Sequence, residues 1–128
     1  MQKQQRISEA EWQVMEVLWT HGPCATAQVL GYLPGGKWSR NTVHTFLTRL
    51  EGKGAVTSET GEHGRIFAAA ISRESCRREE NRSFLQRVYH GSVGAMMKNF
   101  LQEEQLSKEE IDQLRKLLDE AEQREGGE

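Results

Sequence analysis

The stretch from Trp38 to Leu50 combines an apolar stripe with side chains that can donate hydrogen bonds. The apolar stripe has the spacing of a helix packed on a core and consists of Val43, Phe46, Leu47 and Leu50. The positions between them are rich in donors and contain no carboxylate: Arg40, Asn41, His44, Thr45, Thr48 and Arg49. A helix with such a face suits the DNA major groove, whose base edges are read by hydrogen bonds.

The flanking residues predict where this helix begins and ends. Ser39 is a good N-cap, and Lys53 with Gly54 forms a good C-terminal stop. A shorter helix over 27–33, capped by Thr26, is predicted before it, and the Pro34-Gly35-Gly36 run ends that helix. Two short helices joined by a tight turn, the second with a polar face, predict a helix-turn-helix.

The segments on either side predict a scaffold and a wing. Ser8 to Glu11 has the pattern of a capping box, and the helix behind it should end at His21-Gly22-Pro23. Two β-prone runs, 55–59 and 65–71, flank the sequence Gly61-Glu62-His63-Gly64 and predict a hairpin. Arg65 and, less surely, His63 would then bring charge to phosphate or the minor groove, although an ordinary polar turn explains them equally well.

Three amphipathic helices are predicted after Ser72, and their apolar stripes are too large to leave in water. A homodimer would bury these stripes, although a single chain folding its helices back on the wing domain is the alternative. We therefore predict a mainly α protein with a small β-hairpin, in which 1–71 is a winged helix-turn-helix and 72–128 a helical dimerisation domain. The expected dimer interface comprises Phe84, Leu85, Val88, Tyr89, Val93, Met96, Met97, Phe100, Leu101, Ile111, Leu114, Leu117 and Leu118.

The overall charge of the chain does not favour nucleic-acid binding, but the charge of one segment does. The chain of 128 residues carries a net charge of −2, but 37–65 holds five Lys or Arg against three Glu. A local basic patch is what phosphate binding requires. No apolar run is long enough for a membrane span, and no signal peptide is visible, so we expect a cytoplasmic protein without membrane insertion.

Catalytic and metal-binding patterns are weak. The four histidines (His21, His44, His63 and His90) are isolated, and neither a nucleophile elbow nor a phosphate loop occurs, so we expect no enzyme activity. His21 and Cys24 have metal-like spacing, but nothing completes a site, so no metal or other cofactor is expected. Cys24 and Cys76 are best interpreted as two buried thiols.

Long stretches of the chain resemble one family. Ile7 to Trp19, Trp38 to Leu50 with Lys53-Gly54, and Phe84 to Val93 with Asn99 to Leu101 look like the penicillinase and methicillin-resistance repressors. The copper-transport repressors share the first half of the resemblance. Their paired CxC motifs are missing from the tail after Asp119, which argues against copper sensing.

The resemblance implies a winged-helix homodimer that binds a palindromic operator and blocks transcription. It implies that Asn41, Thr42, His44 and Thr45 meet DNA, although the best-known members have Lys and Arg where Asn41 and His44 stand. It further implies release by proteolysis between Asn99 and Phe100, and hence a membrane-linked sensor metalloprotease as a partner. Phe100 is equally well explained as dimer core.

The candidate DNA-contacting residues are those of the helix face, its stop and the wing. Arg49 and Lys53 are expected on phosphate, and Asn41 on a base. The full set is Ser39, Arg40, Asn41, Thr42, His44, Thr45, Arg49, Lys53, His63 and Arg65. Two alternatives remain: a winged-helix module that binds protein, and a ligand- or metal-responsive repressor that is not released by proteolysis.

Overall fold

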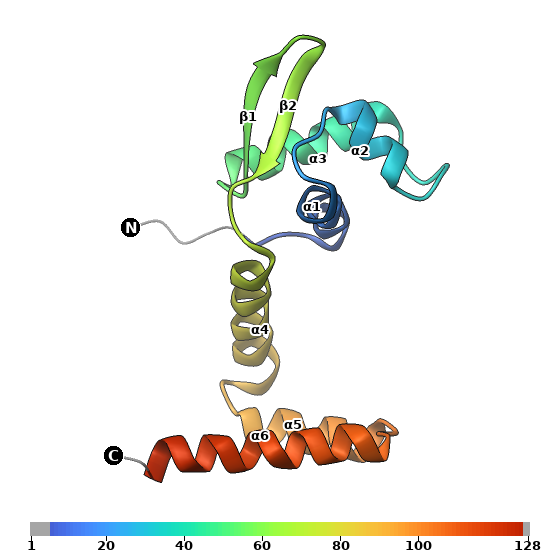
Figure 1. Ribbon diagram of the computed structural model, residues 1–128. Coiled ribbons are helices and arrows are strands. Elements are labelled where there is room, and N and C mark those ends of the chain that lie inside the picture. Colours follow the sequence, from blue (N-terminus) through green and yellow to red (C-terminus); the bar gives the residue numbers. More distant parts are fainter. Residues whose placement is uncertain (1–5, 127–128) are drawn as a thin grey trace. The chain divides into compact units, whose positions relative to one another are not determined.

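The computed structural model describes residues 6–126, so the ends of the two predicted domains, 1–5 and 127–128, lie outside the described residues. Six helices and one two-stranded antiparallel sheet follow one another in this part of the chain (Figure 1). They are α1 (Glu9–His21), α2 (Thr26–Tyr32), α3 (Arg40–Gly52), β1 (Val56–Gly61), β2 (Gly64–Ala69), α4 (Arg73–Tyr89), α5 (Val93–Glu103) and α6 (Lys108–Gly126). No helix among the described residues has the length and apolar character required to cross a membrane.

The chain divides into two compact units, one that ends at Asn81 and one that begins at Arg82. The sequence predicts a boundary before Ser72, whereas the division into compact units falls inside α4. The first turns of α4 belong to the N-terminal unit because Cys76 is buried in its core, at 2% exposure. Arg73 also donates from Nε to Glu16 Oε1 of α1 over 2.8 Å, which ties the beginning of α4 to the same unit.

Helices α1, α2 and α3 and the hairpin enclose one hydrophobic core. The apolar stripe predicted for α3 supplies Val43, Leu47 and Leu50, and α1 supplies Val14, Met15 and Leu18, all at 2% exposure or less. Phe67 of β2 is the largest fully buried side chain and is 1% exposed. Three helices closed by a hairpin form a winged helix-turn-helix, as the sequence predicts.

The ends of α1 and α3 follow the predicted caps. Ser8 Oγ accepts from the Glu11 amide, and the Glu11 carboxylate accepts from the Ser8 amide, so the capping box is present. Ser39 Oγ accepts from the Thr42 amide at the beginning of α3. After α3 the chain reverses at Gly54, whose φ of 81° is a left-handed conformation that glycine adopts without steric cost.

The predicted cap of α2 is wrong. Ala25 is the N-cap, and its amide donates to the Gln28 side chain over 2.8 Å. Thr26 is instead the first residue of the helix, and its hydroxyl oxygen lies 3.0 Å from Nδ1 of His44. The prediction failed because Thr is a favoured N-cap residue, whereas this helix begins one residue earlier, where the side-chain oxygen of Gln28 accepts from the Ala25 amide.

The hairpin is tighter than the sequence predicts. Its strands extend to a Gly61–Gly64 pair, which leaves only Glu62 and His63 in the loop. A Cβ at Gly61 would lie 3.0 Å from Cγ1 of Ile66 and 3.1 Å from the Gly64 carbonyl oxygen, so a larger residue there would require these neighbours to shift by a few tenths of an ångström. Cys24 pairs with Phe67 through two backbone hydrogen bonds of 2.8 and 2.9 Å, which anchors the hairpin to the helices.

The C-terminal unit is helical, but among the described residues it buries no side chain. The chain turns between α4 and α5 at His90 and Gly91, both with positive φ. Ser92 caps α5, and Ser107 and Glu110 form a capping box at the beginning of α6. These helices therefore begin at local signals, without a core of their own.

Candidate nucleic-acid interface

The outer face of α3 is exposed and positively charged. Arg40, Asn41, His44, Thr45 and Arg49 are exposed, whereas the stripe on the opposite side of α3 is in the core. Neither Arg40 nor Arg49 has an ion-pair partner among the described residues. The sequence-predicted face is thus brought together on one helix with its two guanidinium groups unpaired.

The threonines on this face have turned their hydroxyl protons toward the helix backbone. Thr45 donates to the Asn41 carbonyl and Thr48 to the His44 carbonyl, each over 3.0 Å. Thr42 Oγ1 lies 3.0 Å from Ser39 Oγ at the cap. The side chains of Thr45 and Thr48 therefore offer a ligand their methyl groups and the lone pairs of their hydroxyl oxygens. A threonine methyl is suited to contact with the thymine methyl group.

His44 has a buried partner that the sequence analysis missed. Its Nδ1 lies 3.0 Å from Oγ1 of Thr26, which is 7% exposed at the beginning of α2. The ring also packs edge-on against Phe67 of the wing, with centroids 5.9 Å apart and planes at 79°. No local pattern could have indicated this, because the two hydrogen-bonded residues lie 18 positions apart on different helices.

Lys53 is engaged within the protein, in contrast to its predicted role on phosphate. Its Nζ donates to Glu11 Oε1 over 2.5 Å and to the Arg6 carbonyl over 2.8 Å, and its side chain is 16% exposed. Burial raises the pKa of the Glu11 carboxyl, but hydrogen bonds from Lys53 and from the Ser8 amide outweigh it, so this pKa lies below its ordinary value. We therefore leave Lys53 out of the proposed DNA-contacting set.

The wing carries its charged residues on two different faces. Cross-strand pairing places Ser58, Phe67 and Arg65 on one face of the hairpin. Ser58 Oγ donates to Glu51 Oε2 of α3 over 2.6 Å, so this face is turned to α3. Arg65 is therefore on the α3 side and exposed, whereas His63 at the tip is 96% exposed and only 4.0 Å from the Glu62 carboxylate.

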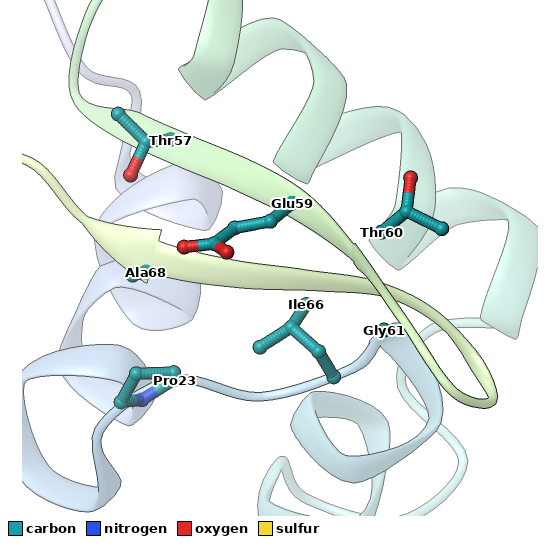
Figure 2. A pocket seen from close by; sticks show the side chains of 7 residues that line it. All are labelled: Pro23, Thr57, Glu59, Thr60, Gly61, Ile66 and Ala68. Atoms are coloured by element: carbon teal, nitrogen blue, oxygen red, sulfur yellow. The ribbon is translucent and has the colours of Figure 1, made fainter.

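The opposite face of the hairpin forms an open hollow against Pro23 (Figure 2). Its lining is Pro23, Thr57, Glu59, Thr60, Gly61, Ile66 and Ala68. Glu59 is its one charged residue, and Figure 2 shows that side chain beside Ile66, over the hollow. A carboxylate repels phosphate, so the Arg65 side of the wing is better suited to a polyanion than this hollow.

The cysteines and acidic residues form no metal centre among the described residues, where no three His, Cys, Asp or Glu side chains gather. Cys24 and Cys76 are free and buried, as predicted. Burial raises the pKa of both thiols. Buried thiols with a raised pKa are poor nucleophiles and poor metal ligands.

The predicted dimer residues are half-buried or exposed in the single chain. Phe84, Leu85, Tyr89, Met96, Met97 and Leu114 are half-buried. The others are largely exposed: Val88 at 48%, Val93 at 54%, Phe100 at 44%, Leu101 at 49%, Ile111 at 37%, Leu117 at 59% and Leu118 at 69%.

The predicted cleavage site lies within helical backbone. Asn99 and Phe100 are both exposed in the second half of α5, and Asn99 Nδ2 donates to the Tyr89 hydroxyl over 3.3 Å.

Known proteins resemble this chain over nearly its whole length. The family model described as penicillinase repressor matches residues 7–120. The penicillinase repressor of Bacillus licheniformis is 38% identical over 123 residues, which cover 94% of each protein. The methicillin resistance regulatory protein MecI of Staphylococcus aureus (strain N315) is 28% identical over 117 residues, covering 91% of this chain and 95% of MecI. The solution structure of the DNA-binding domain of the repressor BlaI is 34% identical with a TM-score of 0.50, covering 57% of this chain and 90% of that domain.

Proposed function

The chain belongs to the penicillinase repressor family, and on that premise we propose that it is a sequence-specific DNA-binding transcriptional repressor. The observation that carries the proposal is the exposed face of α3, which has two unpaired guanidinium groups and several hydrogen-bond donors but no carboxylate. This face fits a ligand that offers phosphates and base edges. Such a repressor acts in the bacterial cytoplasm, where the chromosome is, and needs no catalytic group.

In the proposed complex, α3 lies in the major groove and the Arg65 side of the wing lies over the neighbouring backbone. Asn41 and His44 point to bases, because a side-chain amide and an imidazole both carry directional hydrogen-bonding groups. Arg40, Arg49 and Arg65 neutralise phosphates. Ser39, Thr42 and Thr45 border the same surface, whereas His63 contributes little charge beside Glu62.

We further propose that two copies of the chain bind a palindromic operator as a homodimer. Large apolar side chains on α5 and α6 are exposed in the single chain, among them Leu117 at 59% and Leu118 at 69%. Burial against a second copy would stabilise them by about 25 cal/mol for each Å² of apolar surface. A two-fold dimer presents two α3 helices to two half-sites related by the same symmetry.

The test is binding of fluorescent duplexes at several salt concentrations. The duplexes should include the chain's own promoter and a shuffled control. We expect affinity for the promoter duplex to fall steeply as salt rises, because phosphate contacts release counterions. A salt-independent interaction, or equal affinity for both duplexes, would instead favour a winged-helix module that binds protein or binds DNA without specificity.

Two substitutions separate the proposed roles on α3. Arg49→Ala should weaken binding to all duplexes alike and reduce the salt slope by about one. Asn41→Ala should relax preference at one operator position by about 1–3 kcal/mol. Lys53→Met serves as a comparison, because its ammonium already binds Glu11. If Lys53→Met lowers the salt slope as much as Arg49→Ala, then Lys53 does reach phosphate.

We also propose that cleavage of the Asn99–Phe100 bond, by a membrane-linked sensor metalloprotease, relieves repression. Cleavage there separates the DNA-binding unit from Leu101, Ile111, Leu117 and Leu118, four of the exposed apolar residues. Proteases act on extended chain, so α5 must open locally before it is cut. Mass spectrometry of the protein from β-lactam-treated cells should find a fragment ending at Asn99. An intact chain released by a ligand or metal would contradict this mechanism.

A further inference from the structure

The hydrogen bond between Thr26 of α2 and His44 of α3 bears on which nitrogen of the His44 ring carries the proton. We propose that Thr26 is a positioning residue for base recognition: its hydroxyl donates to Nδ1 of His44, so that α3 presents Nε2–H to an acceptor on a base edge. This inference rests on the proposed function. Thr26 would act only through His44, since its own side chain is 7% exposed.

The direction of the hydrogen bond follows from the protons that each group has. Oγ1 of Thr26 and Nδ1 of His44 are 3.0 Å apart, and either the hydroxyl or the ring must donate. The Thr26 hydroxyl has no second acceptor among the described residues. In α3, Thr45 and Thr48 each donate to the carbonyl four residues earlier. For Thr26 that carbonyl belongs to Gly22, and it accepts from Cys24 Sγ over 3.3 Å instead.

The hydroxyl therefore donates to the ring. If Nδ1 carried the proton and donated instead, the buried Thr26 hydroxyl proton would have no acceptor, and an unmade buried hydrogen bond is costly. With Nδ1 as the acceptor, the proton of the neutral imidazole is on Nε2. The outward nitrogen of the neutral ring is therefore a donor.

The ring is also held in place. Phe67, at 1% exposure, meets the imidazole edge-on at 79°, and the hydrogen bond fixes the side of the ring that carries Nδ1. Nε2 is on the other side of the ring and has no protein partner among the described residues, in a side chain that is exposed. The donor is thereby aimed away from the core without the freedom of an isolated histidine.

A fixed donor selects among base pairs by chemical class. Nε2–H can be accepted by guanine N7 or O6, by adenine N7 or by thymine O4, but not by the exocyclic amino group of cytosine. A histidine without the Thr26 contact could change tautomer and accept from that amino group. Thr26 thus adds specificity, because accommodating a base donor would require the hydrogen bond between the helices to break.

Two variants of the full chain test this. Thr26→Val keeps the shape of the side chain and removes the hydroxyl, and Thr26→Ser keeps the hydroxyl. Long-range ¹H–¹⁵N spectra of the imidazoles, assigned to His44 by its loss in His44→Ala, report the tautomer directly. We expect Nε2–H in the wild type and in Thr26→Ser, and both tautomers in Thr26→Val. An Nδ1–H wild type, or an unchanged Thr26→Val, would overturn the proposal.

The specificity arm uses duplexes that the wild-type chain selects from a randomised pool. The base pair read by His44 is the one at which His44→Ala loses discrimination. There we expect the wild type and Thr26→Ser to reject by about tenfold the pair that places the cytosine amino group where the preferred pair presents its acceptor. Thr26→Val should reject it by a few-fold at most, with unchanged preferences elsewhere.

The outcomes of this arm are distinguishable. If Thr26→Val weakens all duplexes equally, Thr26 is only structural and the inference fails. If it keeps the wild-type discrimination, the inference also fails. If the wild-type chain enriches no duplex at all, the proposed function itself fails, whatever the imidazole spectra show.

Discussion

The N-terminal unit and the C-terminal helices use the same local signals but differ in what they bury. Both contain a capping box that begins a helix, at Ser8 and at Ser107. All of the buried hydrophobic side chains of the described residues lie in the N-terminal unit. Most of the exposed large ones lie in the C-terminal unit, and Tyr32 is the exception.

This difference indicates that caps and periodicity make helices but do not make a folding unit. The N-terminal unit closes its own core around Phe67, which makes α3 a rigid platform for its exposed face. The C-terminal helices leave their stripes open, which is the condition expected of a chain that completes its core with a second copy. Substitutions in both units test the contrast.

Phe67→Ala should break the N-terminal unit. Removing a fully buried phenyl ring from this core should cost about 4 kcal/mol of its free energy of unfolding. Tryptophan fluorescence during denaturation measures this unit alone, because Trp12, Trp19 and Trp38 all belong to it. Leu118→Ala, at a side chain 69% exposed in the single chain, is the control and should change that transition by less than about 0.5 kcal/mol.

Leu118→Asp should break assembly while leaving the N-terminal unit folded. We expect a monomer by light scattering, and affinity for a duplex with two half-sites reduced on the order of 100-fold, because the second binding event is no longer intramolecular. Binding to a single half-site should be unchanged. Tyr32→Asp is a matched control, since Tyr32 is 54% exposed but lies on the N-terminal unit. If the Leu118→Asp variant still forms a dimer, our account of the C-terminal helices is wrong.

Lys53→Met should destabilise the N-terminal unit in a pH-dependent way. It leaves the Glu11 carboxylate, 2% exposed, without its cation, at a cost of about 3 kcal/mol near neutral pH. The cost should shrink in acid, where Glu11 becomes protonated. Urea unfolding followed by tryptophan fluorescence at several pH values measures this.

The wild type should itself lose stability in acid. The pKa of Glu11 lies below its ordinary value of 4.5 in the folded protein. Its contribution to stability is therefore complete above pH 4.5 and is lost as the pH falls from there through the lower, folded pKa. Glu11→Gln should remove this part of the acid dependence. An identical acid profile in Glu11→Gln would show that the carboxylate is not responsible.

Ser8→Ala and Ser107→Ala compare the same motif in the two regions. Each should cost about 1 kcal/mol, because each removes the side chain that caps a helix. Ser8→Ala should lower the tryptophan unfolding midpoint, and Ser107→Ala should leave it unchanged while promoting dissociation of the proposed dimer. Equal shifts of the tryptophan transition in both variants would mean that the two regions unfold as one.

The sequence predicted the features that depend on near neighbours along the chain. The caps at Ser8 and Ser39 were predicted because the side chain and the amide it caps are three residues apart. The stripe through Val43, Leu47 and Leu50 was found because helical period alone places these residues on one side. The same reasoning failed at Thr26, where Gln28 supplies the local hydrogen bond instead.

The tertiary structure decided which of the polar residues are available to a ligand. Lys53 and Glu11 are 42 residues apart, and Thr26 and His44 are 18 apart. Whether such groups meet depends on how α1, α2 and α3 pack, and no spacing in the sequence encodes that. Packing thus gives both Lys53 and His44 a partner within the protein, and the contact of Lys53 with phosphate stays a prediction. The sequence by itself determined that α3 is a helix with one apolar and one polar face, and the packing of its neighbours determined which hydrogen-bonding groups that polar face offers.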